Sequence, residues 1–171
     1  MFDYCQPTRI HFGEGRLKEI SSICSRYGEK CFLVTTPDAP LQPLYDRVKC
    51  YLNQGGIHVV HFDQVSPNPS AKMVEKGFEL LKESKADFVL AVGGGSSIDT
   101  AKTLAFCNGQ EKIDWDELFT RYSSPYVNYE AYSDSSLPLV TVPTTSGTGS
   151  QVTQAAVITK GKEKITFYHP S

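Results

Sequence analysis

The fold of this chain is decided by the stretch Asp87-Phe88-Val89-Leu90-Ala91-Val92-Gly93-Gly94-Gly95-Ser96-Ser97-Ile98-Asp99-Thr100-Ala101-Lys102. Its apolar run, residues 88–92, is typical of a parallel-sheet strand that is buried on both faces. Three glycines then allow a sharp turn and a close approach of the backbone to a ligand. Ser96 is predicted to cap the helix that follows. The amides at such a helix start favour a phosphate or pyrophosphate, and a turn that binds nothing is the alternative.

Length and composition indicate one globular domain. The chain has 171 residues, of which 40% are hydrophobic and 21% charged, and its net charge is −2. This balance leaves no basic face for nucleic acid or an anionic membrane. The N-terminus lacks the pattern of a signal peptide, and no apolar run approaches the roughly 20 residues of a membrane span. We therefore expect a cytoplasmic protein without nucleic-acid or membrane partners.

Cysteine usage agrees with a reducing compartment. The five cysteines are odd in number and form no Cys-x-x-Cys pair, so neither a disulfide framework nor a zinc knuckle is indicated. We expect mostly buried, reduced thiols at Cys5, Cys24, Cys31, Cys50 and Cys107.

Strands and helices alternate along the chain, which predicts an α/β fold with a parallel sheet covered by helices on both faces. Hydrophobic periodicity predicts strands at 7–12, 30–36, 57–62, 88–92 and 137–143, and helices at about 16–27, 44–52, 70–86 and after Gly95. Residues 114–119 are predicted as a short helix, 120–136 as an exposed loop, and 154–159 with 164–167 as a β-hairpin.

Four loops are expected at one rim of this sheet, because ligands bind at the carboxyl ends of parallel strands. They begin at Thr36 and cover residues 66–70, 93–99 and 144–148. In the second of them, Asn68 is held between two prolines, which restrict the backbone on either side. A long, doubly phosphorylated ligand suits this arrangement better than a small one.

The two small-residue loops at 93–102 and 143–150, together with Ser66-Pro67-Asn68-Pro69, closely resemble those of the iron-containing (group III) alcohol dehydrogenases. The resemblance runs from about Thr8 to the last residue. It implies a Rossmann-like sheet with a C-terminal β-hairpin, and a nicotinamide cofactor lying across it. Glycerol dehydrogenases and dehydroquinate synthases share this layout, but they usually vary the residues after the third glycine.

The resemblance also implies which residues bind the cofactor. The pyrophosphate would lie on Gly94, Gly95, Ser96 and Ser97, with Asp99 near the nicotinamide side. Ribose and phosphate would be held by Asn68, Thr144, Thr145 and Thr148, and cofactor-contacting positions are occupied by Val157 and Lys164. Each has a structural alternative: Asp99 as a helix cap, Asn68 as a brace for its turn, and the threonines as partners of unpaired amides.

Thr36 departs from the pattern of the family's NAD-preferring members, which often end this strand with an aspartate that bonds the adenosine 2′-hydroxyl. Without that carboxylate, a 2′-phosphate would meet no charge repulsion. We therefore expect the cofactor to be NADP or NAD, with NADP slightly favoured.

The family's metal, iron or zinc, is bound by one Asp and three His of a helical second domain, all beyond this chain. The histidines here are His11, His58, His61 and His169, and none shows i, i+4 spacing with a carboxylate nearby. The resemblance thus implies that residues 1–171 form an NAD(P)-binding domain truncated before the helical metal domain. We expect this chain to hold no catalytic or metal-ligating residue, and iron or zinc to be present in the full-length enzyme only.

The whole enzyme would interconvert a primary alcohol and an aldehyde by metal-assisted hydride transfer, with this chain alone inactive. A non-catalytic nucleotide-binding module or remnant and a glycerol dehydrogenase-like polyol enzyme are the alternatives. Because the predicted edge strand at 7–12 could pair between subunits, we also expect a homo-oligomer, a dimer or larger.

Overall fold

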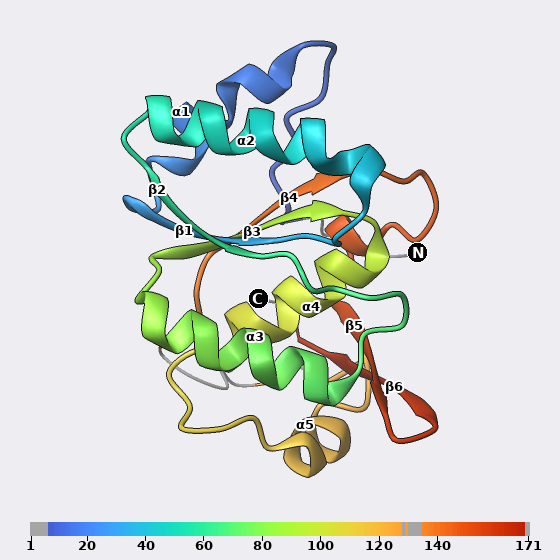
Figure 1. Ribbon diagram of the computed structural model, residues 1–171. Coiled ribbons are helices and arrows are strands. Elements are labelled where there is room, and N and C mark those ends of the chain that lie inside the picture. The colour runs from blue at the N-terminus through green and yellow to red at the C-terminus, as the bar shows by residue number, and fades with distance from the viewer. Residues whose placement is uncertain (1–6, 128, 130–134, 170–171) are drawn as a thin grey trace.

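A four-stranded parallel sheet lies between two helical layers in the computed structural model, which describes residues 7–127, 129 and 135–169 (Figure 1). The strand order is β2-β1-β3-β4, and the strands are β1 (Lys30–Val34), β2 (His58–Phe62), β3 (Phe88–Gly93) and β4 (Leu139–Pro143). Every residue of β3 is buried, as its apolar run predicts. The chain reverses its direction across the sheet between β1 and β3, so a crevice opens at their carboxyl ends.

Helices cover both faces of the sheet. One face carries η1 (Arg16–Glu19), α1 (Ile20–Cys24), η2 (Ala39–Leu41) and α2 (Gln42–Gln54), and the other carries α3 (Ala71–Ser84) and α4 (Gly95–Cys107). Each face has its own cluster of buried apolar side chains. The Ser70 hydroxyl caps α3 by accepting a hydrogen bond from the Met73 amide at 3.3 Å, as predicted.

The chain ends in an antiparallel hairpin of β5 (Ala155–Lys160) and β6 (Glu163–Tyr168), which packs beside α4 and α5 (Trp115–Arg121). The short helix η3 (Ser150–Val152) leads into it. At the far end of β5, the Thr159 amide donates to the Pro69 carbonyl at 2.8 Å. The predicted α/β fold, with its parallel sheet and C-terminal hairpin, is confirmed. Within the described ranges, no helix is both long and apolar enough to cross a bilayer.

The predicted strand at residues 7–12 is wrong. The segment is exposed and has no regular structure, because a strand needs a neighbour for its backbone hydrogen bonds and β4 does not pair with it. The helix predicted over about 16–27 is shorter and begins as a 3₁₀ turn.

Two local predictions also need correction, whereas the one for the cysteines does not. Gly94 rather than Ser96 is the N-cap of α4, because the helix begins at Gly95, two residues earlier than predicted, and Ser96 lies within it. Tyr122, in the predicted exposed loop at 120–136, is fully buried against the aromatic ring of Phe106, while residues 128 and 130–134 lie outside the described part of that loop. The described cysteines are mostly buried, as expected: Cys24, Cys31 and Cys107 are buried and Cys50 is exposed on α2, while Cys5 lies outside the described residues.

Candidate functional site

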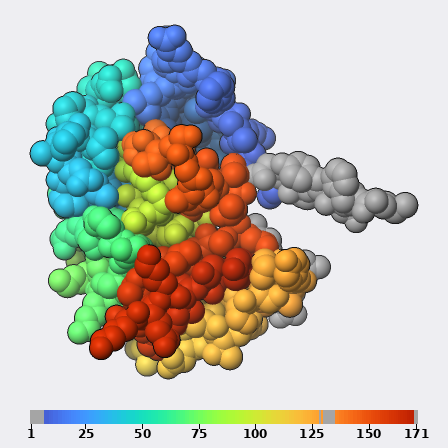
Figure 2. Space-filling view, turned by 90° about the vertical axis from the view of Figure 1, so that its right-hand side faces the viewer, coloured from blue at the N-terminus to red at the C-terminus, as the bar shows by residue number. Residues whose placement is uncertain are grey.

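The four predicted loops meet at the rim formed by the carboxyl ends of the parallel strands. Figure 2 looks onto this rim and shows the yellow-green start of α4 at its centre, framed by the cyan segment after β1, the orange loop after β4 and the red hairpin. The Thr144 amide donates to the Gly93 carbonyl at 3.0 Å, so the loop after β4 begins directly beside the glycine turn. Segments that are far apart in sequence therefore build one surface.

Two adjoining cavities open on this rim, and together they are lined by all twelve residues singled out from the sequence. The larger, of about 480 Å³, is bordered by Thr36, Gly94, Gly95, Ser96, Ser97, Thr144, Thr145 and Thr148. The smaller, of about 220 Å³, is bordered by Asn68, Gly95, Ser96, Asp99, Thr148, Val157 and Lys164. Gly95, Ser96 and Thr148 are shared by both, so the start of α4 separates two compartments of one elongated site.

Sequence reasoning missed several residues of these walls, namely Asp38, Leu41, Pro67, Pro69, Gly147 and Thr159. All but Leu41 lie within two residues of a predicted one, so proximity in sequence was the available signal. Thr159 is brought in by its backbone bond to Pro69 and Leu41 by η2, which only the tertiary structure shows.

The start of α4 offers hydrogen-bond donors that the helix itself does not pair. Ile98 is the first residue of the helix whose amide bonds to a preceding carbonyl, that of Gly94 at 3.1 Å, so the amides before it have no acceptor within the helix. Ser97 is fully buried, and its hydroxyl has no hydrogen-bond partner among the described residues. A buried hydroxyl left unpaired is costly, so this donor set is suited to an anionic oxygen.

Gly95 is required by the contact between the two small-residue loops. A Cβ at this position would lie 2.9 Å from Cγ2 and 3.1 Å from Oγ1 of Thr148, closer than side chains normally approach. A Cβ added at Gly94 would also be crowded, though less severely, because it would lie 3.2 Å from Cγ2 of Thr145. The glycines thus let the two loops close on one another around the start of the helix.

Asp99 is bonded to the protein through both oxygens of its carboxylate. Ser150 Oγ donates to Oδ1 at 2.6 Å, and the Val157 amide donates to Oδ2 at 3.2 Å. Burial raises the pKa of Asp99, an effect that these two hydrogen bonds oppose. Asp99 does not cap α4, because Gly94 does. It joins α4 to the segment that carries the hairpin.

Lys102, one turn further along α4, makes a second connection to that segment. Its ammonium donates to the carbonyls of Thr153 at 2.8 Å and Ala155 at 2.7 Å, and to the Thr153 hydroxyl at 3.3 Å. Burial lowers the pKa of Lys102 to about 8, with the nearby Asp99 acting in the opposite direction. We call Asp99 and Lys102 the α4 latch, since together they hold the hairpin that brings Val157 and Lys164 to the smaller cavity.

At the other end of the site, Thr36 lies between the carboxylate of Asp38 and the hydroxyl of Tyr45. Its Oγ1 donates to Asp38 Oδ2 at 2.7 Å and lies 2.9 Å from the hydroxyl of Tyr45, whose side chain is fully buried on α2. Since the single Thr36 proton goes to the carboxylate, Tyr45 is the donor in the second bond. Thr36 therefore contacts the larger cavity together with an acidic neighbour.

None of the described histidines borders either cavity. The His61 ring lies 2.8 Å from Thr35 Oγ1, and burial lowers its pKa, while His169 is buried against Phe106. Across the part of the chain that the structure describes, no three His, Cys, Asp or Glu side chains group as metal ligands. The described residues thus do not fit a metal ion.

Comparison with known proteins gives consistent matches over nearly the whole chain. The family model described as iron-containing alcohol dehydrogenase matches residues 7–171. A choline dehydrogenase of Bacillus subtilis (strain 168) is 38% identical over 162 residues, which are 94% of this chain and 39% of that protein. NADH-dependent butanol dehydrogenase A of Clostridium acetobutylicum is 33% identical over 171 residues, or 98% of this chain and 42% of that protein.

Solved structures agree with these sequence matches. NADH-dependent butanol dehydrogenase A from Thermotoga maritima superposes with a TM-score of 0.86 at 31% identity, covering 99% of this chain and 42% of that one. The chain therefore spans less than half the length of the relatives it matches. Relatives named as NADH-dependent and as NADPH-dependent butanol dehydrogenases both occur.

Proposed function

This chain belongs to the iron-containing alcohol dehydrogenase family, and from that premise we propose that it is the nicotinamide-nucleotide-binding part of an oxidoreductase that interconverts a primary alcohol and an aldehyde. One observation carries the proposal: the start of α4 separates two cavities that form one elongated site, and the buried Ser97 hydroxyl, on the side of the larger cavity, has no hydrogen-bond partner among the described residues. An elongated ligand with a central diphosphate matches this arrangement.

The residues of this chain bind and orient the cofactor. The amides at the start of α4 donate to the diphosphate oxygens, and the hydroxyls of Thr144, Thr145 and Thr148 supply further hydrogen bonds. Lys164 offers an ammonium group to ribose or phosphate at the smaller cavity. The bound nicotinamide would supply the hydride chemistry. Orientation of the ring depends on the hairpin and therefore on the α4 latch.

The role that we propose for this chain does not include metal binding. Because the described residues present no ligand group, we propose that the family's metal is held by a helical domain outside residues 1–171. The chain by itself then binds nucleotide but has negligible dehydrogenase turnover.

The test of this function is a nucleotide titration of the chain, wild type against Ser96→Asp. A carboxylate in the first turn of α4 interacts favourably with the helix dipole, by about 0.3–1 kcal/mol, so folding is preserved or improved. The same charge would repel the cofactor diphosphate, and we expect the affinity for NADH and NADPH to fall at least about tenfold. Calorimetry measures the affinities and circular dichroism the thermal midpoint.

Ser96→Asn is the matched control, because it has the same size without the charge. It should keep most of the affinity. Wild-type chain that binds neither nucleotide, or Ser96→Asp that binds as tightly as Ser96→Asn, would contradict the proposal.

We further propose that the chain self-associates. Ile10 and Phe12 are 64% and 91% exposed in the segment at 7–12, and β4 is an edge strand of the sheet. Pairing with a second copy of the chain would cover these two side chains and the unpaired edge of β4. Light scattering at several concentrations tests this, and a monomer throughout would exclude it.

A further inference from the structure

We propose that Asp38 makes this site select NAD(H) over NADP(H). The inference rests on the proposed function, because it assumes that the site binds a nicotinamide nucleotide. It replaces the expectation from the sequence, where Thr36 in place of a carboxylate slightly favoured NADP. The structure places a carboxylate two residues further on, in the same cavity wall.

The Asp38 carboxylate is held by a directed chain of hydrogen bonds. The buried Tyr45 hydroxyl donates to Thr36, and Thr36 donates to Asp38 Oδ2 at 2.7 Å. Asp38 precedes η2 as its N-cap residue, yet its side chain makes no capping bond to that helix. The carboxylate is therefore oriented by Thr36, and its other oxygen stays available to accept a hydrogen bond from a ligand hydroxyl.

The position of Asp38 is that of a ribose-binding acid in a doubly wound sheet. It follows β1, whose carboxyl end lies beside that of β3, where the glycine turn begins. Its side chain and the Gly94–Ser97 turn border the same cavity. A nucleotide whose diphosphate lies on that turn extends its adenosine ribose toward the loop after the neighbouring strand, where a carboxylate accepts from the 2′-hydroxyl.

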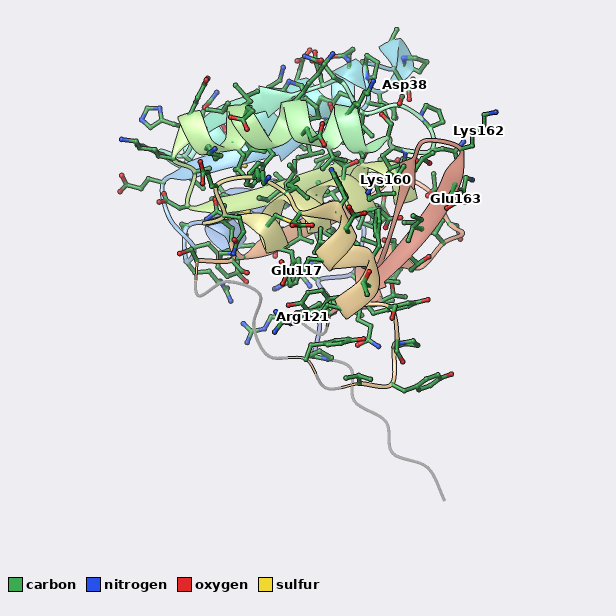
Figure 3. All side chains as sticks on the ribbon, turned by 90° about the horizontal axis from the view of Figure 1, so that it is seen from below. Asp38, Glu117, Arg121, Lys160, Lys162 and Glu163 are labelled. Carbon is green, nitrogen blue, oxygen red and sulfur yellow. The ribbon has the colours of Figure 1, made fainter. Side chains whose placement is uncertain are left out.

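Within the part of the chain that the structure describes, Asp38 forms no ion pair. Among the described residues that border the larger cavity, Asp38 is the single charged one, and lysine and arginine are absent. Lys162 lies at the same end of the molecule in Figure 3, but it does not border the cavity, and Lys160 is paired with Asp116. A 2′-phosphate at this place would face a negative charge without a positive partner, whereas a 2′-hydroxyl would gain a charge-assisted hydrogen bond.

The experiment titrates NADH and NADPH into the 171-residue chain and into Asp38→Asn, with cofactor fluorescence as the readout. We expect the wild type to bind NADH at least about tenfold more tightly than NADPH, because a hydrogen bond to a charged group is worth about that factor. Asp38→Asn should bring the two affinities within about threefold, chiefly by improving NADPH binding as the repulsion disappears.

Asp46→Asn is the control, since it removes the same charge from a 68% exposed carboxylate on α2 and should leave the preference unchanged. Wild type that binds NADPH as tightly as NADH, or a preference that survives in Asp38→Asn, overturns the role of Asp38 while the proposed function stands. Binding of neither nucleotide overturns both.

Discussion

Replacing Lys102 with methionine tests whether the α4 latch positions the hairpin. The two side chains are similar in length, and methionine is a good helix former, so the helix itself is little affected. What is lost is the ammonium and its bonds to the carbonyls of Thr153 and Ala155 at 2.8 and 2.7 Å.

The size of the effect follows from the surroundings of these carbonyls. Thr153 is exposed, so water can replace the lost donor there, whereas Ala155 is only partly accessible. Counting one charge-assisted hydrogen bond as lost and one as replaced, we expect a decrease of about 2 kcal/mol in the free energy of unfolding. For a chain of this size, that is a decrease of about 4–8 °C in the thermal midpoint.

The assay combines thermal unfolding with nucleotide titration. We expect affinity to fall in Lys102→Met, because Val157 and Lys164 lose their fixed place at the smaller cavity. Lys72→Met is the control, since Lys72 is an exposed lysine on α3 and its loss should cost less than about 0.5 kcal/mol. If Lys102→Met is no less stable than Lys72→Met, or binds nucleotide as the wild type does, the latch does not hold the hairpin.

Three other substitutions address the site, the fold and the pH dependence. Ser97→Ala should leave the free energy of unfolding unchanged or raise it by about 1 kcal/mol, because the buried hydroxyl has no partner among the described residues. The same substitution should lower nucleotide affinity in the titration, and an affinity equal to that of the wild type would show that this hydroxyl does not contact the ligand. Gly28→Ala should cost about 2 kcal/mol or more in denaturant unfolding, since φ is 144° and a Cβ would overlap the Asp87 side chain, and wild-type stability would contradict this. Burial keeps the folded-state pKa of His61 below its unfolded value of about 6.5, so the unfolded chain binds the proton more readily and stability falls as pH drops below that value. His61→Gln should flatten this decrease in thermal midpoints measured from pH 7 to 5, and an unchanged slope would assign it to other groups.

The central strand and the glycine turn were predictable because their signals are local. Five apolar residues in a row can only be accommodated where both faces of a strand are buried, and β3 is buried throughout. Ser70 as the cap of α3 is equally local, since the hydroxyl bonds an amide three residues away. The strand predicted at 7–12 failed because alternation describes a side-chain pattern and cannot supply the neighbouring strand that β structure needs.

By itself, the sequence determined the α/β class and most of the order of the elements, because hydrophobic periodicity and small-residue loops are properties of short segments. Twelve of the residues that border the two cavities were implied by the resemblance to a known family. Only the tertiary structure decided what the polar groups at those positions do. Asp99 and Lys102 reach partners more than fifty residues away, and Asp38 is oriented by a hydroxyl that a buried tyrosine of another element holds. Such bonds depend on how layers of the fold pack together, and no pattern of neighbouring residues contains that information.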